Sequence, residues 1–287
     1  MDIIYRFDPY APIEIKHPKT NREALKVLAA GNNRFAKMVE HIQKIGEGNT
    51  QHPPMVIPVN PVTLGVPIVS GLEPAHNPFA LVLGCADARV PIEHVLDCSA
   101  NNLFVVRVAG NVLGLECVGS VDYAATALRQ GLQSVIVMGH TGCGAVTAAV
   151  DIYLSPTDFR SIAFTHPLRS MLDRLQVAVR GSAKALERVC GTKVHKQKHY
   201  REWLITTSIY MNAAITALDL EREVDAMSKG LNVSYNVYDM AWTRIGALPF
   251  RNEQDFESTP AFAPSAKDAE DFNTIAEGII ARLRPGK

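Results

Sequence analysis

The sequence predicts an α/β fold in which a parallel β-sheet is covered by helices on both faces. Three short apolar stretches typical of buried strands, residues 81–84, 103–108 and 134–138, alternate with segments of helical periodicity. This alternation indicates parallel strands, because each crossover between parallel neighbours needs a long connection, which is usually a helix. The chain has 287 residues and is 47% hydrophobic, which is enough to fill a substantial core.

The chain before the first predicted strand divides into two parts. Residues 1–44 are predicted to form an irregular arm and then an amphipathic helix that begins at Asn21, with Leu25 and Leu28 on its apolar face. Residues 45–78 are rich in proline, which excludes a long helix and predicts an insert wrapped over the surface.

The predicted central domain spans residues 79–248. Helices are expected at about 91–98, at about 117–130 and from Gly142 onward, followed by a mostly helical stretch, 155–229, with breaks near Pro167, Gly181 and Gly191. Residues 231–238 alternate apolar and polar side chains, which is typical of a strand that is half exposed or at a sheet edge. Residues 249–287 are predicted to form a polar tail that ends in a short helix over 269–283.

Composition excludes several classes of protein. The 29 basic residues balance the 29 acidic residues, so no basic footprint indicates a nucleic-acid partner. No apolar run approaches the roughly 18 residues that a membrane span needs. The first residues mix charges with prolines, unlike a secretory signal. The five cysteines are widely spaced and do not form a disulfide framework, so we expect a cytoplasmic protein.

Three potential metal ligands follow two of the predicted strands. Cys85 comes directly after strand 81–84, and His140 and Cys143 follow strand 134–138. Parallel strands end at the same edge of a sheet, so these side chains are expected to converge. Two sulfurs and one imidazole form a ligand set for zinc, and three protein ligands leave a fourth position open, as in catalytic sites. The sequence therefore predicts one zinc ion per chain.

Asp87 and Arg89 lie two and four residues after Cys85. A carboxylate beside a zinc site can accept a hydrogen bond from the metal's water, and a bidentate arginine would keep that carboxylate ionised and oriented. We therefore interpret Asp87 and Arg89 as a catalytic pair. Cys98, Cys117 and Cys190 have no accompanying motif and are interpreted as ordinary packed thiols.

These residues resemble the β-class carbonic anhydrases. The resemblance extends over roughly residues 20–245 and rests on the following motifs: Cys85-x-Asp87-x-Arg89-Val90-Pro91, Arg107-x-Ala109-Gly110-Asn111, Tyr123, Gly139-His140-x-x-Cys143-Gly144 and Val237-Tyr238-Asp239. It implies a parallel four-stranded sheet extended by an antiparallel edge strand. It also implies a homodimer, or a dimer of dimers, in which the N-terminal helix lies across the partner.

The resemblance implies roles for individual residues as well. Cys85, His140 and Cys143 would bind zinc, and Asp87 would join them as the fourth ligand only in a closed state. His76, where the family usually has glutamine, and Gly144 would contact the substrate. Arg107 and Tyr123 match two residues of a bicarbonate regulatory site found in one subgroup, whose tryptophan position is Val82 here.

The implied activity is the zinc-dependent reversible hydration of carbon dioxide to bicarbonate and a proton. Two thiolate ligands donate more negative charge than imidazoles do, so activity is expected to rise on the alkaline side of neutrality. One alternative on the same scaffold is hydrolysis of carbonyl sulfide or carbon disulfide. A second, from another class, is a non-catalytic zinc protein or a thiol redox sensor.

Overall fold

The computed structural model describes residues 3–7, 17–46, 55–59 and 71–283. Its main sheet has the strand order β4-β3-β5-β6-β7, with β4 Leu103–Arg107, β3 Ala80–Gly84, β5 Ser134–His140, β6 Asn232–Asp239 and β7 Arg244–Gly246. The first four strands are parallel, and β7 is antiparallel to β6. The predicted fold class, a parallel four-stranded core with an antiparallel strand at its edge, is therefore confirmed.

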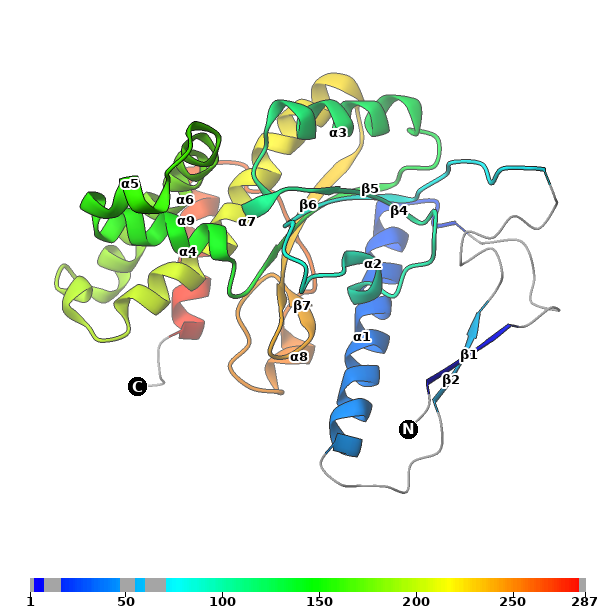
Figure 1. Cartoon of the computed structure of the whole chain (residues 1–287), viewed down its shortest axis with the longest axis horizontal. Coiled ribbons are helices and arrows are strands. Elements are labelled where there is room, and N and C mark those ends of the chain that lie inside the picture. Colours follow the sequence, from blue (N-terminus) through cyan, green and yellow to red (C-terminus); the bar gives the residue numbers. More distant parts are fainter. Residues whose placement is uncertain (1–2, 8–16, 47–54, 60–70, 284–287) are drawn as a thin grey trace.

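Helices cover both faces of this sheet (Figure 1). On one face, α3 Leu115–Ala127 and α7 Tyr200–Met227 contact the strands, and α4 Gly144–Leu154, α6 His166–Cys190 and α9 Ala269–Leu283 pack against α7 within the same hydrophobic cluster. The other face packs against α1 Asn21–Gly46 and the short α2 Ile92–Val95. All five residues of β3 and all seven of β5 are buried, because each of these strands has a strand on either side and helices above and below.

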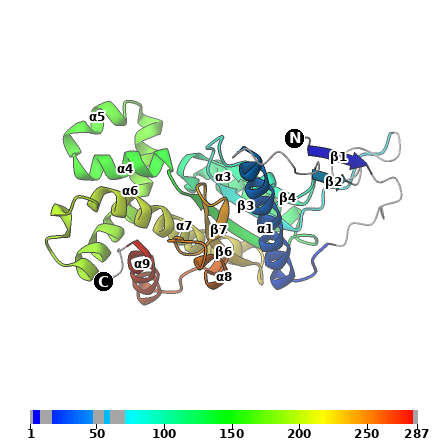
Figure 2. The same cartoon turned by 90° about the horizontal axis from the view of Figure 1, so that it is seen from below.

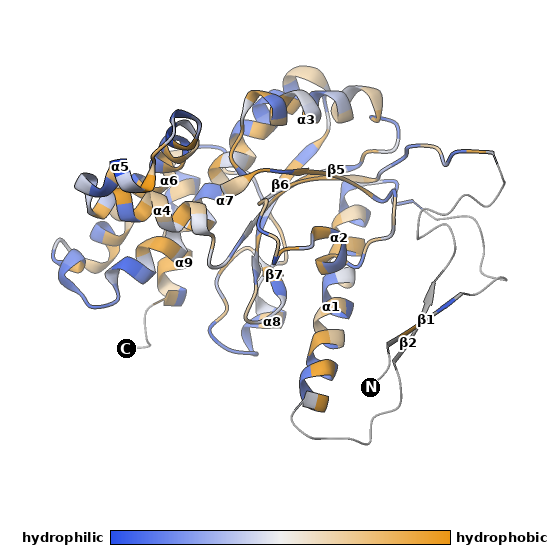
Figure 3. Cartoon of the chain, viewed as in Figure 1, coloured by the Kyte–Doolittle hydropathy of each residue, from blue (hydrophilic) through white to orange (hydrophobic). Residues whose placement is uncertain are grey.

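Helix α1 passes close to the loop that follows α2. A Cβ atom on Gly31 would lie 1.9 Å from the backbone oxygen of Leu96, so only glycine permits this approach. The helix continues without a break to Gly46, and its hydrophobic and hydrophilic residues alternate along the ribbon (Figure 3). Asn32, which follows Gly31, donates from Nδ2 to the backbone oxygens of Val95 and Thr243. These hydrogen bonds connect α1 to the edge of the sheet.

The prediction that residues 231–238 form a half-exposed or edge strand is wrong. Strand β6 lies between β5 and the two short strands β7 and β8 Ala263–Pro264, and all of its residues except Asn232 are buried. Its polar positions include Ser234 and Asn236, which are 5% and 0% exposed. Small polar side chains here occupy the interior, so alternation in polarity did not mean alternation in exposure.

Two further expectations need correction. Helix α6 runs through Gly181 without interruption, because nothing near this residue demands a non-helical backbone and a single glycine in a helix costs only about 1 kcal/mol. The arm predicted to be irregular contains strand β1 Ile3–Phe7, which pairs in parallel with β2 Met55–Val59 (Figure 2).

Most of the proline-rich insert, residues 47–54 and 60–70, lies outside the described residues.

The remaining elements are short, except for the C-terminal helix. They are η2 Ala109–Asn111, η3 Pro156–Asp158, α5 Phe159–Ile162, η4 Val194–Lys196 and α8 Asp255–Ser258. Helix α9 has the predicted bounds, and its Ala276, Ile279 and Ile280 belong to the same hydrophobic cluster as α6 and α7. The last helix of the polar tail thus packs against the core.

Candidate metal centre

The candidate site lies at the carboxyl end of β3. The chain leaves β3 to form β4 on one side, and β5 pairs with β3 on the other side, so β3 ends at the topological switch point where ligands bind in open α/β sheets. Cys85, His140 and Cys143 meet there: one donor atom from each lies within 4.8 Å of the other two. All three are buried, with exposures of 4%, 1% and 1%.

Local backbone features bring His140 and Cys143 to the same point. His140 is the last residue of β5, and Gly142 then adopts a φ of +66°, a left-handed conformation that glycine accepts without strain. Cys143 is the N-cap of α4. A helix N-terminus carries a partial positive charge, which favours a thiolate over a thiol at this position.

The orientation of the His140 ring leaves one nitrogen available for a metal. Nδ1 lies 3.0 Å from the backbone oxygen of Thr141, and since a carbonyl oxygen only accepts hydrogen bonds, Nδ1 carries the proton. Nε2 therefore has the free lone pair. This atom is buried and has no hydrogen-bond partner, which is costly unless a ligand satisfies it. A divalent cation between Nε2 and the two sulfurs would satisfy it.

The two cysteines affect each other's ionisation. Their Sγ atoms lie 4.0 Å apart. The hydrogen bond shared with Cys143 lowers the pKa of Cys85, with smaller contributions from His140 and from the backbone amides of Asp87 and Gly110. The pKa of Cys143 is raised because it holds the shared proton and is buried. A thiolate is the form that binds metal, and the hydrogen bonds to Cys85 favour that form.

Asp87 stands beside the ligand set and is bound by Arg89. Arg89 donates from Nε to Oδ1 (2.9 Å) and from an NH2 group to Oδ2 (2.7 Å), and its backbone N–H also donates to Oδ1 (3.0 Å). These contacts hold the pKa of Asp87 well below its usual range. Oδ2 lies 3.8 Å from His140 Nε2, so the carboxylate faces the site while remaining paired with arginine rather than joining the three donors.

Arg107 has a role that the sequence alone did not reveal. It donates from Nε to the backbone oxygen of Cys85 (3.0 Å) and from an NH2 group to that of Asp87 (2.6 Å). The guanidinium therefore fixes the loop that presents both residues. One feature of the sequence could have predicted this role. Arg107 is the last residue of β4 and is level with Gly84 of β3, so its side chain can reach the loop that follows β3.

The other residues singled out in the sequence lie in different surroundings. His76 stacks on Phe104 with ring centroids 5.9 Å apart, and Phe104 is level with Leu81, four residues before Cys85. At ~3.3 Å per residue that is about 13 Å along the strand, so one chain does not bring His76 to the three donors. Gly144 lies next to Cys143, and a Cβ on it would meet nothing within 4 Å. Tyr123 is 51% exposed.

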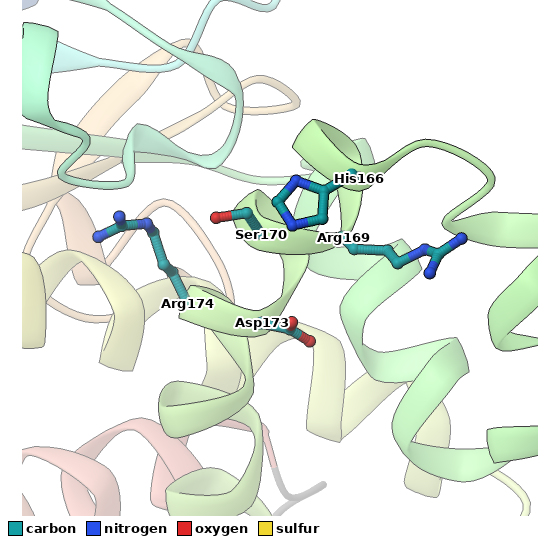
Figure 4. A pocket seen from close by; sticks show the side chains of 5 residues that line it. All are labelled: His166, Arg169, Ser170, Asp173 and Arg174. Atoms are coloured by element: carbon teal, nitrogen blue, oxygen red, sulfur yellow. The ribbon is translucent and has the colours of Figure 1, made fainter.

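Two surface hollows lie elsewhere. One, of about 370 Å³, is lined by His166, Arg169, Ser170, Asp173 and Arg174, all from the exposed face of α6. Figure 4 shows Arg169 and Arg174 extending in opposite directions, so these charges do not converge on a common ligand. None of the candidate metal ligands lines this hollow. Among the described residues, no helix combines the length and the apolar character needed to cross a bilayer.

The donor set fits zinc. Zinc prefers sulfur and imidazole donors in a tetrahedral arrangement, and three protein donors leave one position free. The described part of the chain contains a single cluster of at least three such donors, and it is this one. The Nε2 of His140 has no hydrogen-bond partner, and the lowered pKa of Cys85 favours the thiolate that metal binding requires.

Comparisons with known proteins agree with this interpretation. A family model described as "Carbonic anhydrase" matches residues 80–241. Carbonic anhydrase 2 of Mycobacterium tuberculosis is 37% identical over 134 residues, which cover 46% of this chain and 55% of that protein. The carbonic anhydrase of Mycolicibacterium smegmatis is 35% identical over 127 residues, covering 44% and 52%. The chain thus spans about half the length of the curated relatives it matches.

Solved structures give weaker similarities. A β-carbonic anhydrase from Coccomyxa has a TM-score of 0.49 and 20% identity, covering 67% of this chain and 80% of that one. One of two tetrameric β-carbonic anhydrases from Sordaria macrospora has a TM-score of 0.46 and 22% identity, covering 60% and 80%. Because the family model matches more than half of the sequence and spans the three candidate metal ligands and the aspartate–arginine pair, the chain belongs to the β-carbonic anhydrase family.

Proposed function

We propose that this protein catalyses the zinc-dependent, reversible hydration of carbon dioxide to bicarbonate and a proton. The observation that supports this most directly is the convergence of Cys85, His140 and Cys143 beside a carboxylate that is bound by arginine. A site used only to stabilise the fold would need four protein donors and no such carboxylate.

In this proposal Cys85, His140 and Cys143 bind one zinc ion per chain. Zinc, when bound, supplies a Lewis acid that lowers the pKa of water toward neutrality and so provides the nucleophile for carbon dioxide. Two of the three protein donors are held in place by a neighbour: Gly110 N–H donates to Cys85 Sγ, and His140 Nδ1 donates to the backbone oxygen of Thr141. Such outer contacts maintain ligand orientation.

Asp87 accepts a hydrogen bond from the nucleophile and aligns it. Its Oδ1 already accepts two hydrogen bonds from Arg89, whereas Oδ2 accepts one and faces His140, so Oδ2 is the oxygen with capacity left. Arg89 keeps the carboxylate ionised and turned toward the site. A closed state in which Asp87 becomes the fourth ligand requires these hydrogen bonds to break.

Substrate contacts are proposed at Gly144 and His76. The space around Gly144 is open, which would let a small linear molecule approach the backbone at the start of α4. Since His76 of one chain lies far along the strand from Cys85, its contribution would have to come from a second copy.

A homodimer or a dimer of dimers fits these requirements. Strand β4 ends the sheet order and has only β3 as a neighbour among the described strands, and a free strand edge favours pairing with another chain. We also propose a cytoplasmic location, because all five cysteines are free and a reducing compartment keeps metal-binding thiols reduced. Sedimentation measurements would test the oligomeric state.

The decisive test is stopped-flow hydration of carbon dioxide by protein of known metal content. We expect one zinc per chain and hydration that disappears when the metal is removed and returns when zinc is restored. Turnover on carbonyl sulfide and carbon disulfide, measured in parallel, separates the proposed activity from hydrolysis of these analogues. Metal-loaded protein that turns over none of the three gases would contradict the proposal.

The non-catalytic alternative is tested with the same assay. The 4.0 Å separation of the two sulfurs would suit a thiol redox sensor, but the pairing of Asp87 with Arg89 has no purpose in such a protein. Asp87→Ala should therefore abolish most of the hydration while leaving the zinc content at one per chain. A redox protein without enzymatic activity would have no hydration for this substitution to remove.

A further inference from the structure

The sulfur of Cys85 receives a hydrogen bond from a turn that is held by another part of the chain. The backbone N–H of Gly110, in η2 after β4, donates to Cys85 Sγ at 3.3 Å. A hydrogen bond to a thiolate withdraws charge from the sulfur and fixes its direction, so it influences how strongly the sulfur donates to a metal. The position of Gly110 therefore matters for the site.

The backbone conformation of this turn needs support from the surrounding structure. Gly110 has a φ of +69° and Asn111, which follows, has a φ of +44°. A non-glycine residue in the left-handed region costs on the order of 1 kcal/mol or more and persists only where the surroundings enforce it. A Cβ on Gly110 would lie 3.2 Å from Ala145 Cβ and 3.2 Å from Leu175 Cδ1, so α4 and α6 enclose the turn from the sides.

The hydrogen bond that orients this turn comes from α7. Asn212 lies 102 positions farther along the chain and donates from Nδ2 to the backbone oxygen of Gly110 at 2.8 Å. The side chain is 4% exposed, so water does not compete for this hydrogen bond. The same stretch of α7 also packs against β5, the strand that ends in His140. The Ala213 side chain and the Ile209 backbone oxygen lie close to where a Cβ on Gly139 would be.

We propose that Asn212 is a positioning residue for the metal centre: by fixing Gly110, it aims the Gly110 N–H at the Cys85 sulfur and sets the donor strength and direction of that ligand. This inference rests on the proposed zinc site. No atom of Asn212 needs to touch the metal or the substrate, and the effect passes through a single backbone amide.

The test uses full-length Asn212→Ala, with Asn212→Ser as a milder truncation that removes the same Nδ2 donor and less volume. Cobalt(II) replaces zinc, and the sulfur-to-cobalt charge-transfer band is recorded on fully loaded protein. We expect the band to move to lower energy, because a sulfur that has lost a hydrogen bond gives up charge more easily. In chelator competition, zinc affinity should fall about 10- to 100-fold.

The matched control is Thr216→Ala, one turn farther along α7 at a site that is 5% exposed. It measures what an ordinary loss of packing in this helix does, including the indirect loss of zinc affinity that accompanies any destabilised fold. The control should keep the wild-type charge-transfer band even if its melting temperature falls as far as that of Asn212→Ala.

The outcomes separate the two proposals. Wild-type protein that binds no stoichiometric metal overturns the proposed function. Wild-type protein that binds metal, together with folded Asn212 variants whose band and affinity are unchanged, overturns only the role of Asn212. A band shift of equal size in Thr216→Ala would also overturn it, since the effect would then be general to α7. If Asn212→Ala does not fold, the band of Asn212→Ser decides.

Discussion

Arg89 grips Asp87 with two parallel hydrogen bonds, Nε to Oδ1 and an NH2 group to Oδ2, and at the same time donates to the backbone oxygen of Gly142 at 3.2 Å. The guanidinium thus connects the loop after β3 to the turn after β5. It orients the carboxylate relative to His140, the last residue of β5, and Cys143, which lies just after that strand.

Replacing Asp87 should separate catalysis from metal binding. Asp87→Asn keeps the shape of the side chain but removes the charge and one acceptor, and we expect hydration to fall by about 100-fold or more with zinc content unchanged. Asp151→Asn is the matched control, because Asp151 is held by Arg201 through the same paired contacts of 2.7 and 2.9 Å and lies outside the site. Equal losses in the two variants, or loss of zinc from Asp87→Asn, would contradict the assignment.

The pH dependence of hydration should not report the titration of Asp87. Arg89 lowers the pKa of Asp87, so the carboxylate is ionised throughout the neutral and alkaline range. We therefore expect kcat to rise on the alkaline side of neutrality, and Asp87→Asn to reduce the height of the profile without moving its midpoint. Stopped-flow rates over that pH range test this, and a flat wild-type profile or a displaced midpoint in the variant would be inconsistent with it.

Removing a ligand should remove the metal. His140→Ala and Cys143→Ser are each expected to lose stoichiometric zinc and most hydration, since two remaining donors bind the ion far less well. Chelation of the wild type should lower its melting temperature because the ion stabilises the folded form. Cys117→Ser, at a free and partly buried thiol outside the cluster, should retain its zinc, as measured by elemental analysis.

Two glycines inside helices should respond to alanine with opposite signs. Gly31→Ala brings a Cβ against the Leu96 oxygen, and the resulting shift of α1 should cost about 1–3 kcal/mol of unfolding free energy. Gly181→Ala meets nothing within 4 Å and should raise stability by about 0.5–1 kcal/mol. Denaturant unfolding of both variants measures this, and a neutral Gly31→Ala would show that α1 can move freely.

The acid sensitivity of the tail provides a test that does not depend on the metal. Asp255 is 3% exposed and accepts hydrogen bonds from Arg251 through its backbone N–H (2.8 Å), Nε (3.1 Å) and an NH2 group (3.0 Å), and it also pairs with Arg282. Arg251 first, and then Arg282, lower the pKa of Asp255. A lowered folded-state pKa stabilises the protein above the unfolded-state pKa of about 3.9, and this contribution is lost as the pH falls toward the folded-state value.

Asp255→Asn should therefore cost about 2 kcal/mol at neutral pH, and the difference from wild type should shrink below about pH 4. Thermal unfolding as a function of pH gives both curves. The exposed Glu257→Gln, two positions along the same helix, should leave the wild-type curve unchanged. A difference that grows on acidification would reverse the sign of the proposed linkage.

The sequence by itself predicted the parallel strands and placed the three candidate metal ligands and the aspartate–arginine pair after them. Apolar runs that end in Cys85 and His140 revealed their strands because parallel strands buried on both faces contain little else. The local spacing of Asp87 and Arg89 placed their side chains within reach of each other. These features depend on residues that are near one another in the chain, and for that reason they can be recognised from the chain alone.

Tertiary structure decided what depends on residues far apart in the chain. The burial of Ser234 and Asn236 in β6 depends on the strands and helices around them, and the hydrogen bond from Asn212 to Gly110 joins positions 102 residues apart. Arg107 acquired its role only because β4 lies beside the loop after β3. No local pattern encodes such contacts, because their energy comes from a neighbour that only the complete fold supplies.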